Sequence, residues 1–184
     1  MKKILGVMGS PRINGNTHVL VSKILEGAKE KGAATDIILL KDLNIQECDG
    51  CHTCWKGNEC SKSDDMNNIY PRIIENDIIL FGTPVYWYGP TALMKAFIDR
   101  FVYFKCPENR IKIKGKSAVI VVPFEENNLE TADLLVKMFE KSFEYLEIPL
   151  IEKILISGVT KRGEVIKQEA IIEQCYNLGK KLAL

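Results

Sequence analysis

Five short apolar segments alternate with helix-like segments along the whole chain, and this alternation limits the possible folds more than any other feature. The apolar segments lie at residues 3–8, 35–40, 77–81, 117–122 and 150–157. Stretches with apolar residues at helical spacing follow them, at residues 16–28, 66–74, 90–103, 129–146 and 164–182. Several strands are apolar on both faces, which indicates a parallel sheet covered on both sides. The sequence therefore predicts a three-layer α/β sandwich with five parallel strands in the order 2-1-3-4-5.

The length and charge of the chain limit the number of domains and the kinds of partner that we expect. Its 184 residues suit a single domain spanning residues 1–184. Lys and Arg total 25 and Asp and Glu total 24, giving a net charge of +1 and no field that attracts nucleic acid or anionic lipid. No apolar run approaches the roughly 20 residues of a membrane span, and the first residues lack a secretory apolar region. We therefore expect a cytoplasmic protein that binds neither nucleic acid nor a membrane.

A polar, glycine-containing loop follows the first predicted strand. It reads Gly9-Ser10-Pro11-Arg12-Ile13-Asn14-Gly15-Asn16-Thr17. In an open parallel sheet, ligands bind outside the carboxyl ends of the strands where the strand order reverses. Side-chain donors here and the N-terminus of the next helix suit a phosphate monoester. The expected phosphate-binding residues are Ser10, Arg12, Asn14, Gly15, Asn16 and Thr17. The spacing fits neither Walker A nor G-x-G-x-x-G, and the alternative is an ordinary polar turn with a helix cap.

Three adjacent aromatic residues follow the third predicted strand. The segment reads Pro84-Val85-Tyr86-Trp87-Tyr88-Gly89, and we expect it to lie against a planar ligand. The predicted strand order places this loop and the phosphate loop on one crevice. FMN, with a phosphate at one end and a flat ring at the other, fits that arrangement. The alternative is a subunit interface, and the three aromatics can divide between the two roles.

Four of the six cysteines lie within thirteen residues, in the spacing C-x2-C-x2-C-x5-C. Cys48, Cys51, Cys54 and Cys60 are the candidate metal ligands, because such spacing lets one loop wrap a [4Fe–4S] cluster. Free redox-active thiols and a zinc site are the alternatives. The segment follows the second strand, so we expect it at the same end of the sheet as the crevice, with the loops after strands two and three roughly 10 Å apart.

These motifs resemble the NADPH-dependent FMN reductase-like branch of the flavodoxin-like superfamily, and within it the iron-sulfur flavoproteins. The resemblance rests on residues 9–17, on residues 83–87, on Leu93-Met-Lys-x-Phe-Ile-Asp-Arg100 and on the four-cysteine loop. It implies a flavodoxin-like fold, with the FMN phosphate held by Ser10, Arg12, Asn16 and Thr17. It also implies an isoalloxazine ring against Pro84, Val85, Tyr86 and Trp87, and a [4Fe–4S] cluster on the four cysteines. The loop at residues 122–128 lacks the glycine that many relatives carry there, and Phe124 is its candidate for stacking.

The resemblance further implies a homodimer or homotetramer in which the cluster passes electrons to FMN. Lys95 and Asp99 are expected to form a surface pair on the helix that also carries Arg100, and the resemblance implies that this helix packs at the dimer interface. The expected electron donor is ferredoxin or NAD(P)H. No acid–base pair or nucleophile is apparent, so no catalytic side chain is predicted and the flavin carries the chemistry. The alternatives are an NAD(P)H-dependent FMN or quinone reductase with unmetallated cysteines and a zinc-stabilised binding protein without enzymatic activity.

Overall fold

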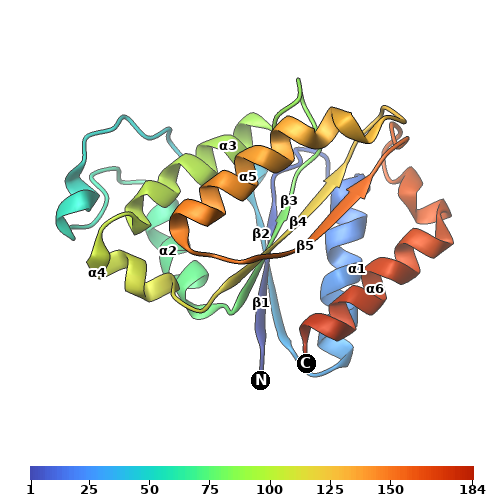
Figure 1. Cartoon of the computed structure of the whole chain (residues 1–184), viewed down its shortest axis with the longest axis horizontal. Coiled ribbons are helices and arrows are strands. Elements are labelled where there is room, and N and C mark those ends of the chain that lie inside the picture. Colours follow the sequence, from blue (N-terminus) through green and yellow to red (C-terminus); the bar gives the residue numbers. More distant parts are fainter.

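All five strands pair into one parallel sheet in the computed structural model, which describes residues 1–184 (Figure 1). The strands are β1 (Lys3–Met8), β2 (Ala34–Leu39), β3 (Ile78–Gly82), β4 (Ser117–Pro123) and β5 (Leu150–Ile156). Their order is β2-β1-β3-β4-β5, which confirms the predicted flavodoxin-like topology. Because β1 lies between β2 and β3, the loops after β1 and β3 leave adjacent strand ends at the point where the chain reverses direction across the sheet.

Helices cover both faces of the sheet (Figure 1). Helices α1 (Asn16–Glu30) and α6 (Glu169–Leu182) pack on one face. Helices α2 (Met66–Glu75), α3 (Ala92–Asp99) and α5 (Asp133–Leu146) cover the other. A short helix, α4 (Pro107–Arg110), lies in the connection from α3 to β4. No helix is both long enough and apolar enough to span a bilayer.

Alternate side chains of each central strand enter two separate hydrophobic cores, as the pleat requires. On β3, Ile79 and Phe81 join the core under α2, α3 and α5. Ile78 and Leu80 join the core under α1 and α6. This two-sided burial explains why the central strands read as continuous apolar runs in the sequence.

The predicted helices differ from the observed ones mainly at their ends. The segment expected as one helix over residues 90–103 is α3 followed by a 3-10 turn at Arg100–Phe104. The predicted helix over residues 129–146 begins with a 3-10 turn at Leu129–Ala132, capped by the Asn128 side chain. Tighter turns at helix ends are common, because the end groups lack α-helical partners.

Cys175 lies on the buried face of α6, and burial raises the pKa of its thiol to about 11 from the usual 9.0. In the unfolded chain the thiol loses its proton above about pH 9, whereas in the folded chain it keeps it until about pH 11. We therefore expect the free energy of unfolding to fall by about 2–3 kcal/mol between pH 9 and pH 11 through this group. Urea unfolding of the wild type and Cys175→Ala over that range measures the effect. Equal pH slopes for the two proteins would contradict it.

Candidate functional site

The loop between β1 and α1 carries an uncapped helix N-terminus. Gly15 is the N-cap residue of α1, and no side chain bonds to the first-turn amides. Those amides have no partner within the helix, so they are available to an anion. Ser10 and Thr17 flank them, and both are nearly buried. The arrangement provides hydroxyl and amide donors around one point.

The loop after β3 is tied directly to this phosphate loop. The Gly9 amide donates to the Gly82 carbonyl at 2.7 Å. The Thr91 hydroxyl, which caps α3 by accepting from the Met94 amide, donates to the Gly9 carbonyl at 2.6 Å. A side chain at Gly9 would lie 2.8 Å from Met94 Cβ, so this close approach requires glycine. The two predicted loops therefore meet, as the strand order implied.

A third loop, residues 157–163 after β5, closes the same site. The Asn16 amide group donates to the Lys161 carbonyl at 3.1 Å and accepts from the Val165 amide at 3.2 Å. Arg162 donates to the Ile13 carbonyl from Nε at 2.7 Å and also from Nη2. Arg12 Nη1 lies 3.5 Å from the Thr160 carbonyl. These bonds hold the loop after β5 against the phosphate loop.

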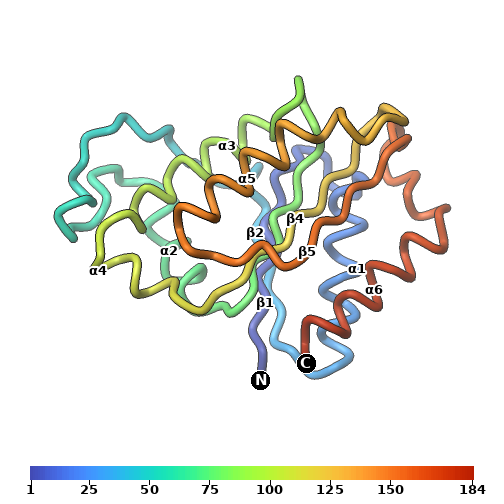
Figure 2. Tube along the Cα trace, in the orientation of Figure 1, coloured from blue at the N-terminus to red at the C-terminus, as the bar shows by residue number.

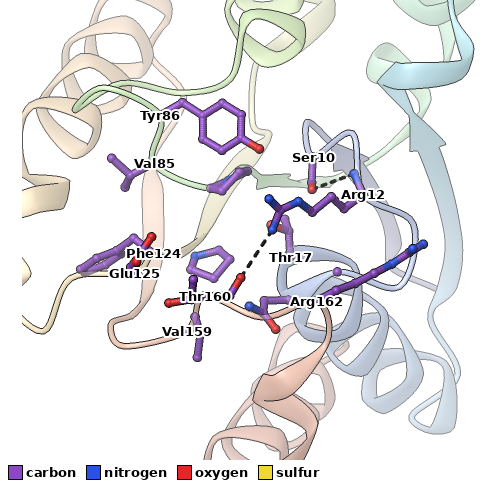
Figure 3. A pocket seen from close by; sticks show the side chains of 14 residues that line it. Ser10, Arg12, Thr17, Val85, Tyr86, Phe124, Glu125, Val159, Thr160 and Arg162 are labelled. Atoms are coloured by element: carbon purple, nitrogen blue, oxygen red, sulfur yellow. Dashed lines mark hydrogen bonds between the residues drawn. The ribbon is translucent and has the colours of Figure 1, made fainter.

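The three loops and the end of β4 enclose a cavity of about 140 Å³ (Figure 3). Ser10, Arg12 and Thr17 lie on one side, and Val85, Tyr86 and Phe124 lie on the other. The full lining is Ser10, Arg12, Gly15, Asn16, Thr17, Pro84, Val85, Tyr86, Pro123, Phe124, Glu125, Val159, Thr160 and Arg162. The cavity is polar and cationic at one end, and at the other it is lined by Val85, Tyr86 and Phe124, with Glu125 next to Phe124.

Eight of the twelve residues expected to bind the cofactor line this cavity. They are Ser10, Arg12, Gly15, Asn16, Thr17, Pro84, Val85 and Tyr86. Asn14, Trp87, Tyr88 and Gly89 do not line it. Sequence reasoning missed the contributions of Pro123, Glu125, Val159, Thr160 and Arg162. The adjacent Lys161-Arg162 pair at the carboxyl end of the last strand was the available signal for an anion site.

The aromatic segment forms a tight turn that separates its three rings. Tyr86 and Gly89 exchange two backbone hydrogen bonds, at 2.8 and 3.1 Å. The residues between them, Trp87 and Tyr88, have φ angles of 49° and 61°. Positive φ at two bulky residues costs conformational free energy, which the two backbone hydrogen bonds of the turn offset. The turn leaves the Trp87 side chain 96% exposed, while Tyr86 lines the cavity.

The four clustered cysteines all line a second, smaller cavity of about 70 Å³. Tyr70, Arg100 and Val102 form part of its wall. Hydrogen bonds with the Ser61 and Thr53 hydroxyls lower the pKa of the Cys51 thiol, whereas burial raises that of Cys54. No three His, Cys, Asp or Glu side chains come close enough in this structure to hold a single metal ion.

The flavin-site cavity and the cysteine cavity share no lining residue. The phosphate loop contacts the first residues of α3 through Thr91, whereas the cysteines meet the turn that follows α3, at Arg100 and Val102. The eight residues of α3 span about 12 Å. The cysteines lie in the long connection from β2 to α2, residues 40–65. This connection extends away from the carboxyl ends of the strands (Figure 2).

Of the three charged residues at and just after the end of α3, two lie at the surface as predicted and one is buried. Lys95 and Asp99 form the expected exposed pair, at 2.6 Å. Arg100, expected on the same interface helix, is instead 1% exposed. The helix tightens into a 3-10 turn at this residue, which directs the guanidinium beneath the cysteine segment.

Comparison with known proteins agrees with this geometry. Residues 2–152 match the family model of NADPH-dependent FMN reductase. An iron-sulfur flavoprotein of Archaeoglobus fulgidus is 29% identical over 98% of this chain and 93% of its own. An iron-sulfur flavoprotein of Methanocaldococcus jannaschii is 39% identical over 53% of this chain and 51% of its own, so only about half of that relative is matched.

Among solved structures, an NAD(P)H:quinone oxidoreductase from Methanothermobacter marburgensis superposes with a TM-score of 0.79. The superposition covers 98% of both chains at 17% sequence identity, so this likeness concerns the fold. The family match covers most of the chain, including the phosphate loop and the loop after β3. The chain therefore belongs to the NADPH-dependent FMN reductase family and is a flavin-dependent oxidoreductase.

Proposed function

We propose that the larger cavity holds FMN, with its phosphate at the uncapped N-terminus of α1 and its ring between the loops after β3 and β4. The observation that carries this proposal is the polarity of one cavity, cationic beside Arg12 and apolar beside Val85 and Phe124. Ser10 and Thr17 fit a phosphate because their hydroxyls supplement the unpaired helix amides. Family membership independently supports FMN.

The protein's part in the reaction is to bind and orient. Tyr86 and Phe124 cover apolar surface beside the ring, and Arg12 balances the phosphate charge. When bound, FMN exchanges two electrons with a nicotinamide and single electrons with one-electron carriers. The cavity, at about 140 Å³, is smaller than the roughly 300–1,000 Å³ of pockets that enclose drug-sized ligands, so part of a bound FMN would lie outside it.

The four-cysteine segment is proposed to hold a [4Fe–4S] cluster, which supplies one-electron chemistry when bound. Four soft thiol ligands around one cavity fit this group, because each iron of a cubane takes one thiolate and the sulfurs need not converge on a single ion. The iron-sulfur relatives support this assignment. With both groups bound, the chain would relay electrons between the cysteine segment and FMN, with ferredoxin or NAD(P)H as the donor.

A second copy of the chain is the proposed partner of the exposed aromatic turn. Trp87 and Tyr88 present large apolar surface held in a defined conformation. Aromatic residues of this kind are enriched at protein interfaces. A homodimer or homotetramer would cover them and bring one chain's cysteine segment toward another chain's flavin.

The test is an absorption spectrum of anaerobically purified protein, with iron, acid-labile sulfide and zinc assayed on the same sample. Flavin bands over a broad visible shoulder, with equal iron and sulfide, are the expected result. Flavin without iron would leave an NAD(P)H-dependent FMN or quinone reductase with free thiols. A colourless, zinc-containing protein would overturn the flavin assignment as well.

Arg162 provides a separate prediction for the phosphate end of the cavity. Replacing Arg162 by Met removes a cavity-lining cation and its bonds to the Ile13 carbonyl. We expect FMN affinity to fall about 3–10-fold at low salt, and by less at high salt, because the site is exposed and its charges are screened. Titrations of FMN fluorescence at two salt concentrations measure this. Lys161→Met, which changes a neighbouring cation outside the cavity, is the control and should leave the affinity within about twofold.

A further inference from the structure

Arg100 is the largest fully buried side chain in the protein, and nothing in the flavin cavity accounts for it. Its guanidinium pairs with the Asp64 carboxylate, whose side chain is also fully buried. Nη1 donates to Asp64 Oδ2 at 2.5 Å, and Nη2 donates to Asp64 Oδ1 at 3.1 Å. Two charges removed from water in this way are costly unless every polar atom is satisfied.

Three further hydrogen bonds of this pair go to the two ends of the cysteine segment. Arg100 Nη1 donates to the Gln46 carbonyl at 2.8 Å, just before the first cysteine. Asp64, just after the last cysteine, accepts from the Gln46 amide at 2.9 Å and from the Met66 amide at 3.1 Å. One buried ion pair therefore closes the base of the loop that carries all four thiols.

Arg100 also reaches a thiol directly. Nη2 lies 3.2 Å from Cys60 Sγ, within hydrogen-bond distance for sulfur. The Tyr70 hydroxyl donates to the Arg100 carbonyl at 3.2 Å and fixes the backbone from which the side chain extends. The guanidinium thus links a fixed point on the turn after α3 to one candidate ligand and to both ends of its loop.

Both members of the Asp64–Arg100 pair are ionised near neutral pH. Burial opposes ionisation of both groups, but the hydrogen bonds with Arg100 and from the Gln46 amide hold the pKa of Asp64 below its usual range. The hydrogen bond with Asp64 likewise keeps the pKa of Arg100 above its usual range in spite of burial. The guanidinium beside the Cys60 sulfur is therefore a charged hydrogen-bond donor whose charge Asp64 balances.

We propose that Arg100 is the positioning residue of the four-cysteine segment: with Asp64 it fixes the ends of the loop, and it donates a hydrogen bond to the Cys60 sulfur. The part of this proposal that concerns the Cys60 sulfur rests on the proposed function, in which Cys60 is a ligand of the cluster. Hydrogen bonds to ligand sulfurs stabilise the more negative, reduced form of an iron-sulfur centre. Arg100 is therefore expected to raise the reduction potential and to slow the loss of iron.

The first measurement uses metal-free protein. In Arg100→Gln the amide hydrogens of Gln46 and Met66 should exchange at least about tenfold faster than in the wild type, because Asp64 loses its partner and the loop opens locally. The matched control is Arg72→Gln, which breaks an exposed Arg–Asp pair with Asp36 away from the cysteines. Bound FMN, measured by flavin absorption, reports whether each variant still folds.

The second measurement uses the reconstituted protein. In Arg100→Gln the chelator concentration that removes half of the iron should fall about 10–100-fold, and the midpoint potential should become more negative. Arg100→Lys keeps the charge but cannot reach Asp64 and Cys60 together, so its potential should lie between those of Arg100→Gln and the wild type.

The outcomes separate the two proposals. Fast exchange in Arg100→Gln but not in Arg72→Gln supports the positioning role, even if the wild type takes up no iron and the cluster assignment fails. Wild-type exchange in a folded Arg100→Gln overturns the role, whatever the iron content. If a cluster forms and its potential is the same in all three proteins, the hydrogen bond to Cys60 is overturned.

Discussion

Replacing Gly179 by alanine is expected to lower the thermal midpoint by roughly 5–10 °C, although alanine favours helix by about 0.5–1 kcal/mol. Helices α1 and α6 pack backbone to backbone at this point. A Cβ on Gly179 would lie 1.9 Å from the Ile24 carbonyl oxygen and 2.8 Å from the Ala28 amide nitrogen. Gly27 faces the Tyr176 carbonyl with a similar approach of 2.0 Å. The helices must separate, and overpacking of this kind costs about 1–3 kcal/mol or more.

The same helix provides the control for Gly179. Asn177 is exposed on α6, so Asn177→Ala should change stability by less than about 0.5 kcal/mol. Calorimetry or circular dichroism melting of both variants measures the difference. Because α1 begins at the phosphate loop, Gly179→Ala should also weaken FMN binding. A midpoint within one or two degrees of wild type, on the order of experimental error, would show that the two helices do not pack this closely.

Removing the hydroxyl of Thr17 should weaken FMN binding about 10–100-fold. Thr17 is 2% exposed and lines the polar end of the cavity in the first turn of α1. Thr17→Val preserves the shape of the side chain but deletes a donor to the phosphate. A hydrogen bond to a charged group contributes about 1.5–3 kcal/mol. Equilibrium titration followed by flavin fluorescence measures the change.

Riboflavin, which has no phosphate, distinguishes a lost phosphate contact from a disturbed fold. Its affinity should be the same in the wild type and Thr17→Val. Ser22→Ala removes a hydroxyl from α1 outside the cavity and should bind FMN normally. Equal weakening of FMN and riboflavin in Thr17→Val would place the phosphate elsewhere.

The fold was predictable because the central strands are buried on both faces and the helices have one apolar face each. After their first residues, Lys3 and Ser117, segments 3–8 and 117–122 have no polar interruption; they agree with β1 and, to within one residue, with β4. The breaks within helices were less predictable. Nothing in the sequence from Leu93 to Phe101 marks Asp99 as the last α-helical residue.

The part of the site on the loops after β1 and β3 was predictable, because these strands are neighbours in the sheet. The part on the loop after β5 was less so. The loop at residues 157–163 follows the edge strand β5, which is not adjacent to β1 or β3. Hydrogen bonds of Asn16 and Arg162 bring it to the cavity, and such long-range bonds leave no local pattern. The buried Asp64–Arg100 pair is similar, because its partners lie 36 residues apart.

The central claim is that this cavity holds FMN for reduction by a nicotinamide. Anaerobic titration of the FMN-loaded protein with NADPH, followed by flavin absorption, tests it most directly. We expect FMN to remain with the protein through gel filtration, and its blue-region absorption to bleach as NADPH is added. A protein that releases FMN during filtration, or whose bound flavin stays oxidised with both NADPH and NADH, would contradict the account.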